Sequence, residues 1–260
     1  GCVTTALVWM QHFGLLGRLL APGPLGEAWL ADATAGRRRG AIAFGGLLPG
    51  PPILTAEPGP DDGWTLHGHA PWVSGWGMVD TVLVAARGPD DTIVSVALDA
   101  VEGAGVRADR VRLAAVDASV TVRLDLEGVV VPAERVAGVE PYDPAASLGR
   151  SLRGNGSLAL GVARRCCTWL GDPALDAELD DVRRALDTAD DDGMAAARAA
   201  ASAFAARAAT ALVVDTGSRS VRLDDHAQRL HREAMFLLVF GSRPAVKASL
   251  SDLVRRPPRP

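Results

Sequence analysis

The sequence predicts an α+β protein of more than one domain: a short helical segment, a central antiparallel β-barrel and a C-terminal up-down helix bundle. Changes in the residue pattern along the 260 residues support this prediction. Apolar residues recur at helical spacing near the N-terminus, short β-branched runs follow between turn formers, and helical spacing returns after Tyr142. We therefore expect domains at residues 1–39, 40–141 and 142–256, with a tail at 257–260.

The first segment is predicted to contain two helices joined by a turn. The turn is Pro22-Gly23-Pro24, and the helices on either side carry apolar stripes. These stripes consist of Leu7, Val8, Phe13, Leu15, Leu16, Leu19 and Leu20, followed by Trp29 and Leu30. Neither helix could bury its apolar face alone, so we expect the segment to be the end of a longer helical domain that is largely missing.

The middle segment is predicted to be a barrel or sandwich of short strands. Clusters such as Pro60-Asp61-Asp62-Gly63 supply the turns, and Pro132 closes the last strand. The predicted strands cover residues 64–66, 81–85, 92–98, 120–126 and 129–131. Several short strands with such turns are typical of antiparallel β-structure. Three tryptophans, Trp64, Trp72 and Trp76, fall on the hairpin that we expect between the first two strands.

The last segment is predicted to be a bundle with helices near residues 154–171, 174–189, 194–216, 225–240 and 244–254. Asp225 with Gln228 resembles a capping box, Gly241 a C-terminal stop and Pro244 a helix start. The alanine-rich stretch 195–214 has small side chains nearly all round, as expected of the central helix of a bundle.

Composition and charge exclude several classes of function. A net charge of −4 gives no basic field for nucleic acid or an anionic membrane, and the run Arg37-Arg38-Arg39 is interpreted as solvated side chains. Three cysteines cannot form a disulfide framework, and adjacent Cys166 and Cys167 are interpreted as reduced thiols. With no leader sequence and no membrane-length apolar run visible, we expect a cytoplasmic protein.

The tryptophan-rich stretch resembles the middle β-domain of the acyl-CoA dehydrogenase family. The family's pattern is approximately G-(W/Y)-x-L-x-G-x-K-x-W-I-(T/S), followed by A-D-x-x-x-V-x-A. The matching residues are Gly63, Trp64, Leu66, Gly68, Trp72, Val73 and Ser74, then Val79, Asp80, Val84 and Ala86.

Further matches follow in the order that the family has them. Val131 to Gly138 resembles the family's V-P-A-E-R-(V/L)-x-G, and Arg232-Glu233-Ala234 stands where the family commonly has R-D-A. Trp29 to Gly36 is similar to the end of the family's N-terminal helical domain. The resemblance therefore covers nearly the whole chain, with most of the N-terminal domain absent.

The resemblance implies a site for FAD. Trp72 is expected to pack near the isoalloxazine, and the hydroxyl of Ser74 to hydrogen-bond near its reactive nitrogen, with Val73 between them. In place of the family's polar flavin-contacting segment the chain has a glycine-rich run. Backbone amides from Gly45 through Gly46 to Leu47 could still meet the pyrimidine edge of the flavin. Trp64 and Trp76 are interpreted as core residues.

The catalytic base that the family uses is not found in this chain. Family dehydrogenases need a carboxylate to remove an α-proton while a β-hydride passes to the flavin. The usual glutamate position, seven residues beyond the alanine of R-D-A, falls on Gly241, and the alternative position falls on Ser151. The arginine–glutamine pattern by which a neighbouring subunit holds FAD phosphates is also not found after Arg165. The catalytic residue is thus unknown.

The sequence gives weaker support for a metal site or a cysteine nucleophile. His67 and His69 could share one face of a strand, but no third ligand is placed, so they are interpreted as surface residues and no metal site is predicted. His226 and His231 point to different faces of a helix, and a cysteine nucleophile would need an activating base that is not identifiable.

The predicted function is that of an acyl-CoA dehydrogenase-like oxidoreductase of the kind found in fatty acid metabolism, acting on the CH–CH bond of acyl-CoA or a related thioester. The resemblance implies a homo- or hetero-oligomer in which a different subunit could complete the active site. Two alternatives stay open: a flavin-dependent monooxygenase of the same fold, and a degenerate subunit kept for assembly alone.

Overall fold

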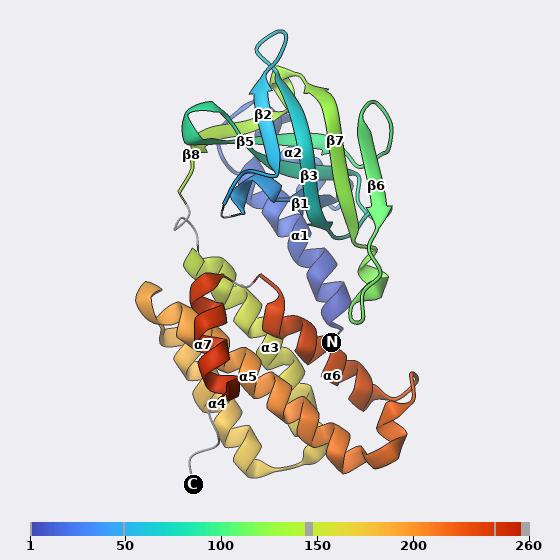
Figure 1. Cartoon of the computed structure of the whole chain (residues 1–260), viewed down its shortest axis with the longest axis vertical. Coiled ribbons are helices and arrows are strands. Elements are labelled where there is room, and N and C mark those ends of the chain that lie inside the picture. Colours follow the sequence, from blue (N-terminus) through green and yellow to red (C-terminus); the bar gives the residue numbers. More distant parts are fainter. Residues whose placement is uncertain (1, 49, 144–147, 242, 256–260) are drawn as a thin grey trace. The chain divides into compact units, whose positions relative to one another are not determined.

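The computed structural model describes residues 2–48, 50–143, 148–241 and 243–255, in a mixed arrangement of helices and one sheet (Figure 1). The described residues divide into two compact units. The sheet unit comprises residues 2–113 and 117–143, and the helical unit comprises residues 114–116 and 148–255.

The sheet unit begins with two helices, α1 (Val3–Leu19) and α2 (Pro24–Thr34), as the apolar spacing predicts. Eight strands follow: β1 (Gly40–Ala43), β2 (Leu54–Pro58), β3 (Trp64–Val73), β4 (Thr81–Arg87), β5 (Thr92–Asp99), β6 (Val106–Arg110), β7 (Val122–Val131) and β8 (Val136–Pro141). Short 3₁₀ turns join them, of which η1 (Gly45–Leu47) and η3 (Asp117–Ser119) matter below.

The strands form one open sheet, which corrects the prediction of a closed antiparallel barrel. Its order is β6-β7-β3-β2-β4-β5-β8, with β1 paired to β4, and no hydrogen-bonded pairing joins β6 to β8 within the described residues. Most pairs are antiparallel, but β1–β4 and β2–β4 are parallel.

The tryptophan-rich stretch is not a hairpin, contrary to the prediction. Strand β3 pairs with β2 on one side and β7 on the other, and β4 pairs with β5. The predicted strands at 120–126 and 129–131 are a single strand, β7, in which Gly128 (φ +64°) is the extra residue of a bulge opposite Leu66 and His67. A further strand, β8, follows Pro132, so that proline does not close the sheet.

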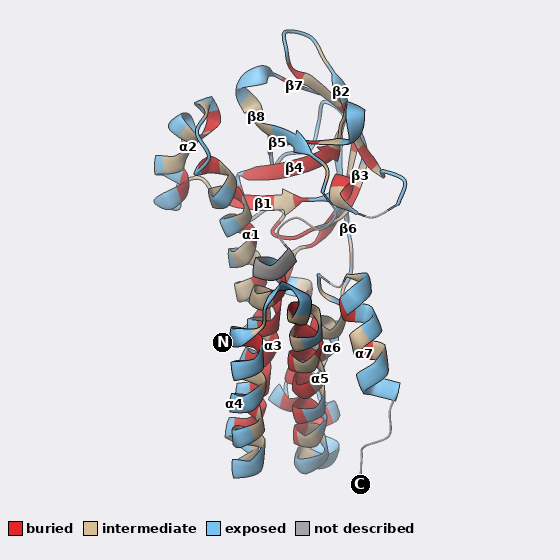
Figure 2. Ribbon diagram, turned by 90° about the vertical axis from the view of Figure 1, so that its left-hand side faces the viewer, coloured by how far each residue is buried: buried red, intermediate tan, exposed pale blue. Residues whose placement is uncertain are grey.

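Apolar side chains are buried on both faces of the sheet. One face forms the main core, on which the half-buried Trp64 and Trp76 pack as predicted. The other face, through Leu83 and Ala97, packs on Leu15 and Leu19 of α1. This second core explains why the two N-terminal helices belong to the same unit as the sheet (Figure 2).

Arginines of the segment between α2 and β1 connect the N-terminal helices to the sheet through ring contacts, hydrogen bonds and ion pairs. Arg38 lies over the Trp29 ring at 3.8 Å and donates to Thr81 Oγ1. Arg39 forms a two-point pair with Asp80, which lowers the pKa of that carboxyl group through its hydrogen bonds to Arg39. Arg37 pairs with Asp32. The arginine run and the aspartate of the resemblance therefore have structural partners inside the unit.

The helical unit contains α3 (Leu148–Leu170), α4 (Pro173–Thr188), α5 (Asp191–Thr216), α6 (His226–Val239) and α7 (Pro244–Arg255), close to the predicted ranges. Helix α5 packs against the other four, as predicted for the alanine-rich stretch. Figure 2 shows its buried residues in red along much of its length. Residues 191–221 are long and apolar enough to cross a membrane by composition, but half of the apolar window is buried inside the protein.

The predicted helix ends are found on α6 and α7. Asp225 accepts a hydrogen bond from the Ala227 amide, while Gln228 donates to the Asp225 and Leu223 carbonyls, so the cap is present without the reciprocal bond of a capping box. Gly241, at φ +58°, follows the last turn of α6. Pro244 begins α7.

Candidate functional site

Trp72 is the exposed aromatic residue at the end of β3. Its side chain is 62% exposed, whereas the next residue, Val73, is completely buried. The ladder between β3 and β7 is irregular between Ala70 and Val73, where Pro71 cannot donate a ladder bond. A local bulge of this kind re-aims a side chain. Trp72 is therefore presented to solvent while its neighbour closes the core.

Ser74 lies just beyond the strand and belongs to a buried chain of three hydroxyl groups. Its Oγ is 2.8 Å from Thr121 Oγ1, which is 2.9 Å from Ser119 Oγ. The backbone fixes this arrangement, since the Gly75 amide donates to the Ser119 carbonyl and the Trp76 amide to that of Val120. These contacts place Ser74, the predicted flavin donor, at the junction between β3 and the start of β7.

Val120 has a strained backbone within this junction. Its φ of +46° lies in the left-handed region, which is a genuine outlier for a β-branched residue. The conformation lets the residues on either side, Ser119 and Thr121, both point toward the hydroxyl chain. Strain of this kind persists where surrounding contacts hold it, and it gathers at functional sites.

The glycines predicted to meet the flavin edge are packed against the sheet. A Cβ on Gly45 would lie 2.7 Å from the His69 carbonyl oxygen, and one on Gly46 would lie 2.5 Å from the Arg87 amide nitrogen. The amide of Leu47 donates to the Phe44 carbonyl. Close packing on β3 and β4 thus accounts for glycine at both positions, and the Leu47 amide already has a partner.

Arg87 holds this glycine turn in place, a role that the sequence analysis missed. Its guanidinium donates to the Gly46 carbonyl at 3.2 Å and to Asp91 at 2.7 Å. It also lies over the Tyr142 ring at 3.4 Å. An arginine at the end of a β-branched strand carries no sequence signal for this role, because Gly46 is 41 residues away.

The two positions where the family's base is expected hold no carboxylate. Gly241 faces the side-chain amide of Asn155 from α3, which lies closer to the position of a Cβ than real atoms approach. Ser151 is exposed near the start of α3. The arrangement at Gly241 thus leaves no room for a side chain of any kind in the present packing.

The remaining reactive side chains do not converge. His67 accepts from the Gly128 amide, and no group of three or more metal-ligating residues exists among those the structure describes. All three cysteines are free. Burial raises the pKa of the Cys166 thiol to about 12, with smaller contributions from Cys167 and Glu233, so this thiol is protonated at neutral pH.

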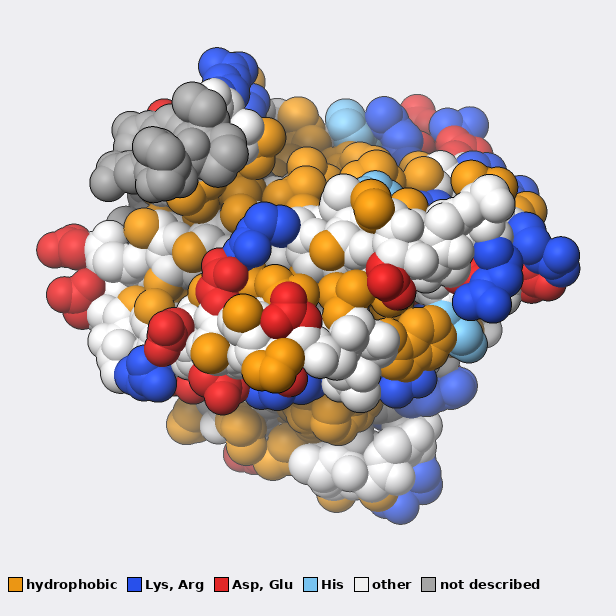
Figure 3. Space-filling model, turned by 90° about the horizontal axis from the view of Figure 1, so that it is seen from below, with side chains coloured by type: hydrophobic (Ala, Val, Ile, Leu, Met, Phe, Trp, Pro, Cys, Tyr) orange, Lys and Arg blue, Asp and Glu red, His pale blue; other side chains and the backbone are white. Residues whose placement is uncertain are grey.

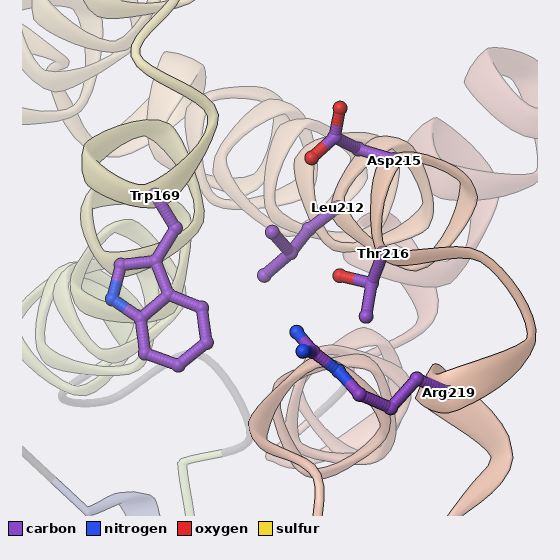
Figure 4. Close-up of a pocket in the computed structure, with 5 residues that line it drawn as sticks. All are labelled: Trp169, Leu212, Asp215, Thr216 and Arg219. Atoms are coloured by element: carbon purple, nitrogen blue, oxygen red, sulfur yellow. The ribbon is translucent and has the colours of Figure 1, made fainter.

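An open hollow in the helical unit is lined by Trp169, Leu212, Asp215, Thr216 and Arg219 (Figure 4). Its volume is about 510 Å³. Figure 4 shows the Arg219 guanidinium directed toward Thr216 and the Trp169 ring, and Arg219 also pairs with Asp225. Figure 3 shows hydrophobic side chains interspersed with both signs of charge on the face seen from below.

Solved structures are similar to this chain, although no protein-family model and no curated protein sequence matches it. Butyryl-CoA dehydrogenase from Megasphaera elsdenii has a TM-score of 0.70 at 19% identity, over 88% of this chain and 71% of that one. FkbI, a protein for biosynthesis of the methoxymalonyl extender unit of Fk520, has a TM-score of 0.73 at 20% identity, over 98% and 82%. The chain has an acyl-CoA dehydrogenase-like fold.

The same fold also serves oxygenation. Dibenzothiophene monooxygenase TdsC from Paenibacillus sp. A11-2 has a TM-score of 0.71 at 16% identity, over 96% of this chain and 78% of that one. Because one fold supports several reactions, the reaction of this chain has to be argued from its own site.

The sheet unit offers some of the groups that a flavin needs. Trp72 presents an aromatic plane to solvent, and Ser74 brings a hydroxyl group to the end of the same strand. The glycine turn η1 also packs on β3 and β4, although its tightly packed α-carbons form no cradle that a ligand would fill. The tryptophan and the hydroxyl group therefore fit a flavin better than the glycine turn does.

Proposed function

We propose that the chain is a flavin-dependent oxidoreductase, or one subunit of one, that acts on the CH–CH bond of an acyl thioester such as acyl-CoA. The observation that carries the proposal is Trp72, which is 62% exposed on the acyl-CoA dehydrogenase-like fold, two residues before Ser74. An exposed aromatic side chain at a rigid strand end offers a large, flat contact area to a ligand.

Bound FAD would supply the electron acceptor for the oxidation. Trp72 would contribute a flat apolar surface beside the isoalloxazine, with Val73 fixing the backbone behind it. Ser74 would hold a hydrogen-bond donor at the ring. Gly45, Gly46 and Leu47 would border the same strand, and the Leu47 amide would not donate to the flavin because it is already bonded to Phe44.

The proton acceptor for dehydrogenation would come from outside the family's usual positions. Gly241 is enclosed by Asn155, and Ser151 has no carboxyl group. A carboxylate from a partner subunit would supply the base, which makes the protein part of an oligomer. Apolar side chains of the helical unit that are mostly exposed, Val214, Val221 and Leu223, are candidates for the surface that such a partner covers.

The monooxygenase alternative is favoured by the same observation at Gly241. Oxygen activation by a reduced flavin does not use the dehydrogenase glutamate, so a glycine enclosed by Asn155 is no obstacle to it. Dibenzothiophene monooxygenase, with a TM-score of 0.71, provides a precedent on this fold. The third reading, a subunit kept for assembly alone, requires no flavin.

The experiment is a flavin titration followed by two reaction assays. The purified chain is titrated with FAD while the absorbance spectrum and protein fluorescence are recorded, and saturable binding is the expected result. Anaerobic bleaching by a series of acyl-CoA thioesters then supports dehydrogenation, whereas oxygen uptake that requires reduced flavin supports oxygenation. Absence of FAD binding, alone or with its partner subunit, would overturn both enzymatic proposals.

A further inference from the structure

The buried hydroxyl chain has a direction that follows from counting its protons. Ser74, Thr121 and Ser119 carry one hydroxyl proton each, and two hydrogen bonds join them. One proton is therefore left over and has to find an acceptor outside the chain. Which residue carries the unused proton depends on which of the three hydroxyl groups can reach solvent or another acceptor.

Ser74 is the least buried of the three residues. Ser119 is completely buried and Thr121 is 2% exposed, whereas Ser74 is 8% exposed. Among the described residues, the side-chain hydrogen bonds of all three hydroxyl groups lie within the chain, so the unused proton is best placed on the least buried residue, where it can reach solvent or a ligand. A buried donor without an acceptor destabilises the folded state. The favoured arrangement is Ser119 donating to Thr121, and Thr121 donating to Ser74.

We infer that Ser119 and Thr121 are positioning residues that direct the Ser74 hydroxyl proton outward, toward an acceptor atom of the bound ligand. Because Thr121 donates to Ser74, the Ser74 proton is not used within the chain. Ser74 is then left with a free donor at the least buried end of the chain. The strained backbone at Val120 is the structural device that brings Ser119 and Thr121 to the same side.

The inference deepens the proposed function and rests on it for the identity of the ligand. The central ring of an oxidised flavin has a nitrogen that accepts hydrogen bonds and that later receives the hydride. A fixed donor facing this atom favours the electron-rich form of the ring. The direction of the hydroxyl chain is independent of any ligand and can be measured without one.

The first test uses two matched variants without flavin. In Ser74→Ala, Ser119 and Thr121 keep two hydroxyl protons but only the one hydrogen bond between them, so one buried proton has no acceptor. In Ser119→Ala, Thr121 still donates to Ser74 and Ser74 still donates outward, so no proton is stranded. We expect Ser74→Ala to raise the unfolding equilibrium constant about tenfold more than Ser119→Ala, measured by urea unfolding. An equal loss, or a larger one for Ser119→Ala, would overturn the direction.

The second test measures the donor toward the flavin. The protein is titrated with FAD and with 5-deaza-FAD, in which a C–H group replaces the accepting nitrogen. We expect a preference for FAD of about fivefold to tenfold in the unmodified protein. It should disappear in Ser74→Ala, fall below about twofold in Thr121→Val, and return in Thr121→Ser, which keeps the hydroxyl group.

The control for this test is Ser95→Ala, which removes a buried hydroxyl group of the same unit that accepts from Arg18. It should keep the full preference, because Ser95 is not in the chain. A full preference in Thr121→Val would show that Thr121 does not position the donor. If the unmodified protein binds neither flavin, the proposed function and the assignment of the ligand both fail, while the unfolding comparison still decides the proton direction.

Discussion

The side-chain amide of Asn155 fills the space that a side chain on Gly241 would need. Asn155 comes from α3, and Gly241 follows α6, so the contact is made by the packing of two helices within one unit. The residue at 241 also has φ +58°, a conformation that glycine adopts without cost. Two independent causes therefore favour glycine at position 241: its positive φ angle and its contact with Asn155.

We predict that Gly241→Ala destabilises the helical unit more than a matched glycine substitution does. Gly171→Ala is the match, because Gly171 follows the last turn of α3 with a similar φ of +64° and open space around it. That variant should lose only the left-handed penalty of about 1–2 kcal/mol. Gly241→Ala should lose roughly 1–2 kcal/mol more in urea unfolding.

The double variant Asn155→Ala, Gly241→Ala separates the two causes. Removing the amide should recover the extra loss, so the two substitutions should couple by about 1 kcal/mol in a double-mutant cycle. Strict additivity would mean that Asn155 does not enclose position 241.

We predict that Trp72 contributes to flavin binding and little to stability. Trp72→Ala should change the free energy of unfolding by less than about 0.5 kcal/mol, because the side chain is mostly exposed. The dissociation constant for FAD should rise about tenfold, the scale of stacking on an aromatic ring. Trp9→Ala is the control, since Trp9 is 63% exposed on α1 and should leave FAD binding unchanged. Equal FAD affinity in the two variants would contradict the assignment.

Thiol reactivity should distinguish the three cysteines. Burial raises the pKa of Cys166 to about 12 and also raises that of Cys167, whereas hydrogen bonds with Thr5 and Thr4 outweigh partial burial and lower the pKa of the exposed Cys2. We expect one thiol of the folded chain to react rapidly with a disulfide reagent at pH 8, and all three to react in denaturant. Rapid reaction of three thiols in the folded chain would contradict this.

The buried Cys166 thiol should also make stability depend on pH. Above about pH 8.5 the unfolded thiol loses its proton, while the folded thiol keeps it until about pH 12. The folded state then binds more protons, so stability falls as pH rises, by up to about 1.4 kcal/mol per pH unit. The difference in unfolding free energy between the unmodified protein and Cys166→Ala should therefore shift in favour of the variant from pH 8 to pH 10.

Sequence reasoning located the helices better than the sheet. The periodicity and caps of α4 and α6 are local, so the Asp172 and Asp225 caps and Pro244 mark the helix ends directly. Strands β1, β2, β6 and β8 are short and depend on distant partners, so they went unpredicted. The hairpin prediction failed because β3 finds its partner in β7, beyond several intervening strands.

The same distinction explains what could be predicted of the site. Trp72 and Ser74 lie within one motif, so a resemblance could identify them. Thr121 is 47 residues from Ser74, and it reaches that residue only because Val73 pairs with Val122 across β3 and β7. No local pattern encodes that register. Whether these residues hold a flavin stays a prediction.

The last prediction concerns Arg198, a completely enclosed arginine on α5. Its Nη2 donates to the Leu237 and Phe240 carbonyls at 2.8 and 3.2 Å, where α6 ends and its carbonyls lack helical partners. Its Nη1 also donates to Ser202. Burial lowers the pKa of the guanidinium to about 10, so the charge is held at a cost that these carbonyls and the negative end of the helix offset.

Arg198→Met should therefore destabilise the helical unit by about 2–4 kcal/mol in urea unfolding, because the Phe240 carbonyl loses its arginine donor and the Leu237 carbonyl keeps only Ser202. Ser202→Ala, which removes one further donor to Leu237, should cost about 1 kcal/mol. The control is Arg207→Ala, also on α5, which breaks an exposed pair with Glu178 of α4 and should cost less than about 1 kcal/mol. A stable Arg198→Met variant would show that water or a shifted helix end satisfies the carbonyls, and that the arginine is not needed to terminate α6.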